Sequence, residues 1–438
     1  MNIPIAFEEN SEIAARFPDL HPRFDPQPAL VEAERCLNCF DAPCTAACPT
    51  HIDVPRFIKK IANRNLMGSA LTILEANILG ASCSRVCPVE VLCEGVCVLH
   101  RYNKQPIEIA RLQRYAMEAF HASGRALPRK TTEERAQKIA CIGSGPASLA
   151  CAAELCQQGF QVTVFEQRFF PGGLNTYGVA EYKLRATESL REIELIRGLG
   201  VEFRFGVTIE DEESLTALER EYDAIFIGVG LGEARRLGIA GEDHPNVIDA
   251  LRFIEGYKTG RAVQVGRRVI VIGAGNTAID AANASLRLGA EHVTIAYRRT
   301  ADHMSAFSFE YEHALSEGVR YEWRSQPIAI HSNPETGALS SVEFVRMRPQ
   351  PGSAFHLPCD MVITAIGQLP LVSFLEKYRS IAVENGRILV DRRSGLTNHA
   401  KYYAGGDCVN GGLEVVDAVA DGKRAGVAIT QALSVQHA

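Results

Sequence analysis

The sequence lacks the features of a membrane-spanning, secreted or nucleic-acid-binding protein. No apolar run reaches the roughly 18 to 20 residues that a helix needs to cross a bilayer. The first residues, MNIPIAFEENSEIAARF, carry acids where a signal peptide has a basic start and an apolar core. A formal net charge of −6 gives no electrostatic reason to expect nucleic acid or an anionic membrane as a partner. We therefore expect a cytoplasmic protein in a reducing environment.

Cysteine, in contrast, is concentrated in one part of the 438-residue chain. Eight of the 13 cysteines fall in two blocks, CLNCFDAPCTAACP from Cys36 and CSRVCPVEVLCEGVC from Cys83. Tight groups of thiolates with Cys-Pro steps are typical of iron–sulfur ligation. Zinc is the alternative, but the stretch has one Cys-x2-Cys knuckle, and disulfide frameworks belong to small secreted domains. The blocks therefore predict iron–sulfur clusters and one-electron chemistry.

The residue pattern divides the chain into a helical part and an α/β part. In residues 1–130 apolar residues recur at helical intervals, and we expect the cysteines on loops that flank the helices. From Lys138 onward strands alternate with helices, and residues 138–166 and 267–299 each read as strand, glycine turn, helix and strand. This predicts an N-terminal α-helical iron–sulfur domain, followed by a glutathione-reductase-like flavoprotein with two dinucleotide-binding units.

The order of these units predicts that one is inserted into the other. A late strand enters Gly405-Gly406-Asp407 and is followed by a helix, as expected for the last piece of a FAD domain. We expect residues 1–130 to hold the clusters, residues 131–245 and 368–438 to bind FAD, and residues 246–367 to bind NAD(P)H.

The first glycine fingerprint is expected to bind FAD. Gly143 allows the tight turn, Gly145 lets backbone N–H groups approach a pyrophosphate at a helix start, and Ser148 fills the third small position. Glu166 ends the following strand, where it can accept hydrogen bonds from the adenosine ribose. Two later glycine turns are assigned to the same cofactor, at Gly172, Gly173, Leu174, Gly406 and Asp407.

The second fingerprint lacks the acidic residue that would select NAD(H). At the matching strand end the chain has Arg298 and Arg299, whose guanidinium groups can bind a 2′-phosphate. We therefore favour NADP(H), against the alternative of two surface arginines after a strand. The residues expected at this site are Gly273, Gly275, Asn276, Thr277, Arg298 and Arg299.

The α/β part lacks the cysteine pair of a flavoprotein disulfide reductase. Cys141, Cys151 and Cys156 lie in a βα unit that reads as core, and Cys359 and Cys408 are too isolated to form Cys-x-x-Cys. Electrons that reach FAD are therefore expected to leave through the iron–sulfur region.

Several segments together resemble the FAD- and nicotinamide-binding half of dihydropyrimidine dehydrogenase, including its separate bacterial small subunit. The resemblance covers essentially the whole chain, and small subunits of glutamate synthase, which share the architecture, are the alternative. A zinc-bearing interaction protein is a non-enzymatic alternative. The segments are RCLNCFDAPCTAACPTHIDVPRFIKKIANRN, CSRVCPVEVLCEGVC, IEIARLQRYA, GSGPASLACAAEL, PGGLNTYGVAEYKL, GAGNTAIDAA and GGDCVNGGLEVVDAVADGKRAG.

The resemblance implies two [4Fe-4S] clusters with interleaved ligands. Cys83 would then be a non-ligand near the clusters, although spacing alone leaves it open as a fourth thiolate. The implied ligands are Cys36, Cys39, Cys44 and Cys97 for cluster one, and Cys48, Cys87, Cys93 and Gln113 for cluster two.

The resemblance also implies a partner. In this family electrons run from NAD(P)H through FAD and the clusters to an FMN-binding barrel that reduces uracil or thymine. The sequence contains no such barrel, so we expect a hetero-oligomer with an FMN- and iron–sulfur-containing catalytic subunit. Bacterial enzymes of this type can use NAD(H), which conflicts with our interpretation of the two arginines.

Overall fold

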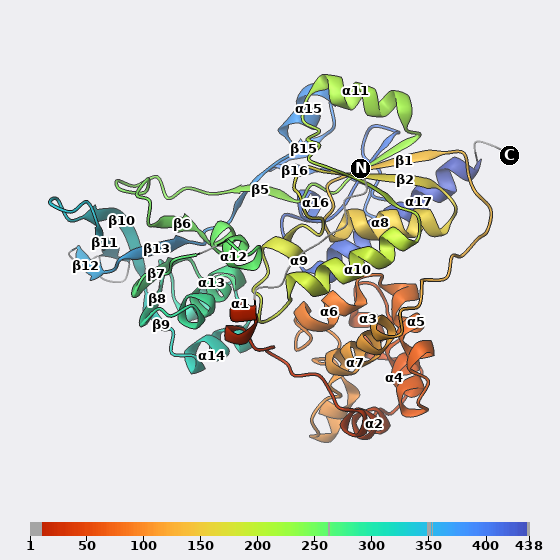
Figure 1. Cartoon of the computed structure of the whole chain (residues 1–438), viewed down its shortest axis with the longest axis horizontal. Coiled ribbons are helices and arrows are strands. Elements are labelled where there is room, and N and C mark those ends of the chain that lie inside the picture. Colours follow the sequence, from red (N-terminus) through yellow and green to blue (C-terminus); the bar gives the residue numbers. More distant parts are fainter. Residues whose placement is uncertain (1–10, 262, 348–351, 353, 436–438) are drawn as a thin grey trace.

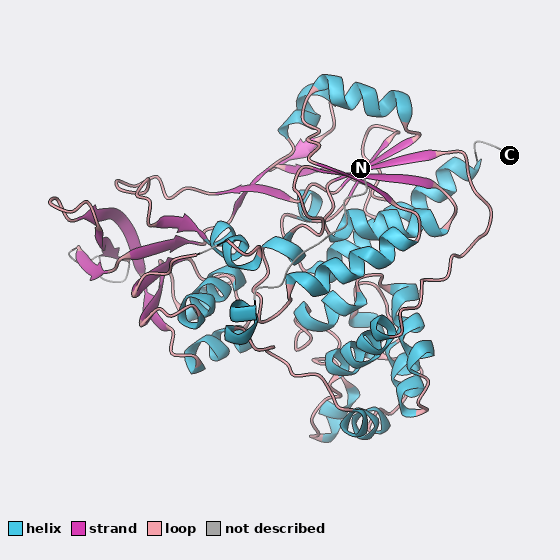
Figure 2. Cartoon of the chain, in the orientation of Figure 1, coloured by secondary structure: helices cyan, strands magenta, loops and turns pink. Residues whose placement is uncertain are grey.

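The computed structural model describes residues 11–261, 263–347, 352 and 354–435. Most of the segment that we compared with a signal peptide lies outside these residues, as do the outermost limits of the predicted first and last domains. Helices fill the N-terminal region and two parallel sheets follow, which confirms the predicted fold class (Figure 1 and Figure 2).

The N-terminal region is helical and carries both cysteine blocks. The apolar stretch between the blocks forms two helices, because Asn65 interrupts it and caps the second one by accepting a hydrogen bond from Gly68 N at 2.9 Å. Cys44 and Cys83 lie inside short helices, so the expected position on flanking loops is wrong for these two. The elements are α1 (Ser11–Arg16), α2 (Pro26–Glu34), α3 (Pro43–Ala47), α4 (Val54–Ala62), α5 (Leu66–Ala76), α6 (Gly80–Val86), the 3-10 helix η1 (Val98–Tyr102) and α7 (Ile109–Ala122).

The first parallel sheet is built from both ends of the α/β part. Its strand order is β17-β4-β1-β2-β3, so the late strand β17 lies beside strands from the start of the unit. Helices α8 and α17 pack against each other and against this sheet. The bounds are β1 (Lys138–Ile142), α8 (Pro146–Gln157), β2 (Gln161–Glu166), α9 (Leu174–Tyr177), α10 (Ala186–Gly198), β3 (Glu202–Phe205), α11 (Glu212–Glu221), β4 (Ala224–Ile227), α15 (Ser373–Arg379), β15 (Val383–Glu384), β16 (Arg387–Ile388), β17 (Tyr402–Ala404), α16 (Asp407–Asn410) and α17 (Val415–Val435).

The second parallel sheet has the order β6-β13-β7-β8-β9. A separate antiparallel sheet, β10-β11-β12, follows β9 in the chain. The bounds are β6 (Val247–Asp249), α12 (Ala250–Lys258), β7 (Arg268–Ile272), α13 (Asn276–Arg287), β8 (His292–Tyr297), the 3-10 helix η2 (Ala301–His303), α14 (Ser308–Ser316), β9 (Arg320–Trp323), β10 (Ser325–Ser332), β11 (Leu339–Arg346), β12 (Phe355–Pro358) and β13 (Met361–Thr364).

Two paired strands connect the sheets. Strand β5 (Leu231–Ala234) leads out of the first unit, and β14 (Gln368–Pro370) leads back and pairs with it in antiparallel orientation. The predicted insertion of the nicotinamide unit into the FAD unit is therefore confirmed, while its exact limits at residues 246 and 367 stay a prediction.

No helix among the described residues is by itself long and apolar enough to cross a membrane. The helices α5 and α6 satisfy length and composition as a pair, but the chain bends by 86° between them.

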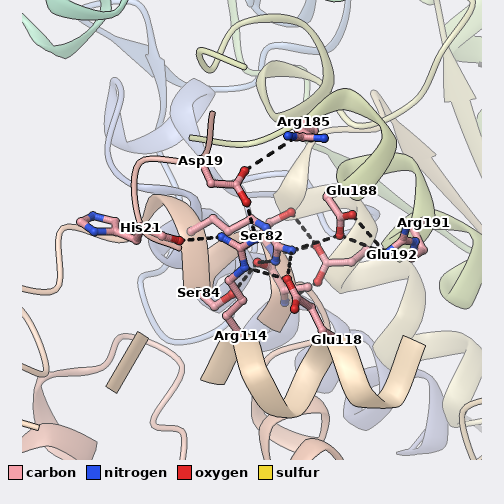
Figure 3. A network of polar contacts seen from close by, with 12 residues as sticks. Asp19, His21, Ser82, Ser84, Arg114, Glu118, Arg185, Glu188, Arg191 and Glu192 are labelled. Atoms are coloured by element: carbon pink, nitrogen blue, oxygen red, sulfur yellow. Dashed lines mark hydrogen bonds and ion pairs between the residues drawn. The ribbon is translucent and has the colours of Figure 1, made fainter. Parts of the chain in front are cut away.

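A buried carboxylate joins the helical region to the FAD unit (Figure 3). Glu192 on α10 accepts hydrogen bonds from Ala81 N at 2.6 Å and from Ser82 N at 2.9 Å, and Ser82 Oγ also donates to it. These groups belong to the first turn of α6, whose own N-cap residue, Leu79, makes no side-chain cap. Because α6 also carries Cys83, this contact holds the second cysteine block against the FAD unit.

Ion pairs surround this contact. Arg85 on α6 lies 3.0 Å from Glu118 on α7 and 3.2 Å from Glu188 on α10. Arg114 on α7 lies 2.7 Å from Glu118 and also pairs with Asp19 at 2.5 Å (Figure 3). Both arginine side chains are largely buried, and each has two acidic partners that compensate its charge.

Glu192 should give this domain contact a pH dependence. Burial raises its pKa from 4.5 to about 7, although the hydrogen bonds from α6 act in the opposite direction. A carboxyl group whose pKa is raised on folding stabilises the folded state below its unfolded pKa. That contribution, roughly 3 kcal/mol for such a shift, is lost as the pH rises towards the folded pKa. We therefore expect the melting temperature of the Glu192→Gln protein to fall less steeply than that of wild type between pH 4.5 and about 7.

The control for this measurement is Glu194→Gln, an exposed position on the same helix. It should keep the wild-type pH dependence of melting. Equal slopes for wild type and Glu192→Gln, recorded anaerobically by near-ultraviolet circular dichroism, would contradict the raised pKa.

Candidate cofactor sites

One large cavity lies where the three parts of the chain meet. Its volume is about 1700 Å³, which exceeds that of an ordinary single-ligand pocket. Its wall includes the glycine turn after β1, the start of α13 in the second unit, and residues around Cys87 in the helical region. The predicted FAD, nicotinamide and second cysteine sites therefore border one space.

The glycine turn after β1 fits a pyrophosphate. Gly143 has a φ of +87°, and a Cβ there would lie 2.6 Å from Gly228 O, so the backbone itself requires glycine. Gly145 has a φ of −70°, which any residue adopts, and a Cβ there would come no closer than 3.9 Å to Gly228 O. Gly145 therefore leaves open space at the start of α8, where unpaired N–H groups can bind a phosphate.

Glu166 is held in the position expected for a ribose-binding carboxylate. It is buried at the end of β2 and lines the cavity. Its Oε2 accepts a hydrogen bond from Ser144 N at 3.0 Å and another from Ser144 Oγ, while its Oε1 accepts from Arg168 N at 2.8 Å. These donors fix the orientation of the carboxylate.

The other predicted FAD residues divide into two groups. Gly172 and Ser148 are buried behind the cavity wall, where Gly172 N donates to Ser144 O at 3.0 Å and Ser148 Oγ donates to Ile142 O at 3.4 Å. These two residues therefore support the turn. The residues that line the cavity are Gly173, Leu174, Gly406 and Asp407.

In the second unit the cavity reaches the start of α13 but not the two arginines. Asn276 and Thr277 line the cavity, and Asn276 Oδ1 accepts a hydrogen bond from Phe307 N at 3.1 Å. Arg298 and Arg299 lie exposed just beyond β8, outside the cavity wall. Their role in selecting NADP(H) stays a prediction. The turn before α13 contains Gly273 and Gly275.

A buried ion cluster in the cavity wall was missed by the sequence interpretation. Lys183 Nζ lies 2.6 Å from Asp280 Oδ1 and 2.6 Å from Glu310 Oε1, and Tyr182 OH donates to Asp280 Oδ1 at 2.9 Å. Burial alone would lower the pKa of Lys183, but the two carboxylates outweigh burial and raise it. The lysine lies in the motif EYKL, but Glu310 follows 127 residues later, so local sequence gives no signal of the cluster.

The first predicted cluster site is a small pocket surrounded by thiols. Cys36, Cys39, Cys44 and Cys97 all line a cavity of about 30 Å³ whose remaining wall is apolar. Burial raises the pKa of the Cys44 thiol to about 12, so a bare thiolate is unfavourable there. Positively charged iron would offset that cost, and four convergent thiols are the donor set of a [4Fe-4S] cluster.

The second predicted cluster site brings together three expected ligands and one further thiol. Cys87 lies close to Cys48, Cys93 and Cys83, and its contact with the Cys83 thiol, together with burial, raises its pKa. Gln113 is buried, and its Nε2 donates to a carbonyl oxygen at the start of α6 at 2.7 Å. Cys83 therefore lies next to an expected ligand, Gln113 contacts the helix that carries Cys83, and the choice of fourth ligand stays open.

Two known families match consecutive parts of the chain and together cover most of it. Residues 13–125 match the family described as dihydropyrimidine dehydrogenase domain II, 4Fe-4S cluster. Residues 137–422 match the family described as pyridine nucleotide-disulphide oxidoreductase. The chain therefore belongs to the pyridine nucleotide-disulphide oxidoreductase family and carries an N-terminal iron–sulfur domain of the dihydropyrimidine dehydrogenase type.

Relatives with the same two parts narrow the class further. The chain is 33% identical to the glutamate synthase [NADPH] small chain of Escherichia coli K12, over 96% of this chain and 94% of the relative. It is 32% identical to the NAD-dependent dihydropyrimidine dehydrogenase subunit PreT of Escherichia coli O157:H7, over 94% and 96% of the two chains. These findings support a NAD(P)H-dependent flavin and iron–sulfur electron-transfer subunit, with FAD, [4Fe-4S] clusters and NAD(P)H as cofactors.

Solved structures agree on the fold of the α/β part. Thioredoxin reductase of T. acidophilum superposes with a TM-score of 0.58 at 19% identity, over 68% of this chain and 99% of that chain. FprA of Mycobacterium tuberculosis in complex with NADPH superposes with a TM-score of 0.55 at 18% identity, over 69% and 86% of the two chains.

The open space at Gly145 predicts a variant that folds but does not hold FAD. A methyl group in Gly145→Ala would enter the space where we expect the pyrophosphate, and Gly228 O, at 3.9 Å, would be at ordinary contact distance. We expect the purified variant to keep the melting temperature of flavin-free wild type within a few degrees and to lose most of its flavin absorbance. Stoichiometric flavin in Gly145→Ala would mean that the pyrophosphate lies elsewhere.

The two candidates for the fourth ligand of cluster two can be separated by iron analysis. Two [4Fe-4S] clusters correspond to about eight iron and eight acid-labile sulfide per chain. We expect Gln113→Ala to alter one cluster and lower the iron content towards about four, while Cys83→Ala keeps about eight. The reverse pattern in anaerobically purified protein would make Cys83 the ligand.

Proposed function

We propose that the chain is the electron-input subunit of a dihydropyrimidine dehydrogenase. It would accept electrons from NAD(P)H and pass them through FAD and two [4Fe-4S] clusters to a partner FMN- and iron–sulfur-containing subunit, which reduces uracil or thymine to the 5,6-dihydropyrimidine. FAD supplies the conversion between a two-electron hydride and single electrons. The observation that carries the proposal is the shared cavity bordered by the FAD turn, the start of α13 and Cys87.

The same cavity supports an order for the two clusters. Cys87 of the second site lies in the cavity wall, whereas the four thiols of the first site line a separate small pocket. Leu37 and Phe40, which flank the first site in sequence, are 52% and 100% exposed. We therefore propose that the second cluster lies next to the flavin and that electrons leave the chain from the first.

The pyrimidine assignment is supported by the iron–sulfur family match and by the similarity to PreT over most of both chains. The glutamate synthase small chain is the second candidate, because a relative of that name is 33% identical over a similar share of this chain. Under that alternative the same route would deliver electrons to a large glutamate-forming subunit. The names of these relatives include both NADPH and NAD, and Arg298 and Arg299 favour NADP(H).

Reconstitution tests where the electrons go. The isolated chain should oxidise NAD(P)H with an artificial dye as acceptor, yet fail to reduce uracil or thymine. Addition of the FMN-containing partner subunit should restore pyrimidine reduction. Because the clusters would lie between flavin and partner, Cys36→Ala should abolish pyrimidine reduction and largely spare dye reduction.

The control variant is Cys359→Ala, a buried cysteine of the nicotinamide unit that should leave both activities near wild type. Pyrimidine reduction by the isolated chain would contradict the proposal. Glutamine-dependent glutamate formation, restored with a large glutamate synthase subunit in place of pyrimidine reduction, would establish the second candidate instead.

A further inference from the structure

Three side chains of metal-binding type meet on the antiparallel sheet of the nicotinamide unit. His331 lies on β10, Glu343 on β11 and His356 on β12. One ligand atom from each lies within 4.8 Å of the other two. We propose that these three residues form a binding site for a divalent transition metal ion of the zinc type.

The strand register explains why the three side chains meet. Glu343 is directly opposite His356, and His331 is opposite Ser341, two residues before Glu343 on the same strand. Side chains two residues apart on a strand share a face of the sheet, so all three ligands project from one side. Val342, between Ser341 and Glu343, is fully buried in the core on the other side. The apolar face therefore fixes the backbone that carries the ligands.

The donor set and its spacing suit zinc. Two imidazoles and one carboxylate favour Zn²⁺, Ni²⁺ or Cu²⁺ over Mg²⁺ and Ca²⁺, which prefer oxygen ligands. His331 Nε2 lies 2.8 Å from Glu343 Oε2, and the two imidazole rings lie 5.1 Å apart. With bonds of about 2.0 to 2.1 Å, ligand atoms in a tetrahedral zinc site are roughly 3.3 Å apart, so small side-chain rotations suffice. Water would complete the coordination.

A neighbouring hydroxyl orients one of the histidines. Ser341 Oγ lies 3.4 Å from His356 Nδ1, which leaves His356 Nε2 for the metal. Histidine ligands of metals usually hydrogen-bond through the second ring nitrogen, and loss of that partner weakens metal affinity. The arrangement around His356 therefore matches that of a ligating imidazole.

This site is separate from the electron route. In Figure 1 the strands β10, β11 and β12 lie at the far left, and the cysteine-bearing helices α3 and α6 lie at the lower right. A bound ion would connect three adjacent strands and stabilise the sheet by mass action. The inference does not depend on the identity of the electron acceptor.

Zinc uptake by the complete, cluster-loaded protein tests the site. We expect equilibrium dialysis against micromolar Zn²⁺, followed by elemental analysis, to give one more zinc per chain in wild type than in His331→Ala/His356→Ala. Iron and flavin contents should be equal in the two proteins. Ser341→Ala should weaken zinc binding by about 10- to 100-fold. X-ray absorption at the zinc edge should show nitrogen and oxygen ligands without sulfur.

The matched control is His303→Ala, which removes an exposed histidine from the same unit and should leave zinc uptake unchanged. Equal zinc uptake by wild type and the double variant would overturn the proposal. Sulfur ligation would overturn it too, because it would assign the zinc to the cysteine blocks. The proposal would also be overturned if the wild-type protein bound the additional zinc only at millimolar concentration.

Discussion

The buried carboxylate of Glu192 at the start of α6 is the contact on which the arrangement of the cofactor sites depends. It satisfies N–H groups that would otherwise be unpaired, and these hydrogen bonds oppose the effect of burial, which raises its pKa to about 7. The same helix carries Cys83 and leads directly to Cys87 at the cavity. The separation between the second cysteine site and the flavin turn is therefore set by a polar contact between domains, reinforced by the ion pairs of Arg85.

The two parallel sheets make the cavity suitable for anionic cofactors. Strand β1 of the first sheet ends at the cavity, and the helices that follow the two glycine turns, α8 and α13, both begin there. The partial positive charges at both helix starts favour nucleotide phosphates. The ion cluster of Lys183, Asp280 and Glu310 adds fixed charges where the two units meet, so the nicotinamide unit is held to the FAD unit by charge as well as by chain connection.

The sequence was sufficient for the architecture but not for all of the site. The local sequence pattern predicts the βαβ units, because a strand, a positive-φ glycine such as Gly143 and a helix follow one another in the chain. The four thiols that the resemblance implies for cluster one line the same small pocket. The ion cluster of Lys183 depends on how separate segments pack, which no local pattern encodes. The position of Arg298 and Arg299 at a strand end and their guanidinium groups predict a phosphate site, but the cavity does not reach them.

The pairing of β5 with β14 has a consequence for the modular history of the chain. Ala234, where the chain leaves the FAD unit, is paired with Gln368, where it returns. The two ends of the inserted segment are thus neighbours, so a short turn would be long enough to join them. Insertion at such adjacent ends disturbs the host fold little. The nicotinamide unit therefore has the chain connections of an inserted domain, and its exchange for another domain would require a replacement for the buried contacts of Lys183.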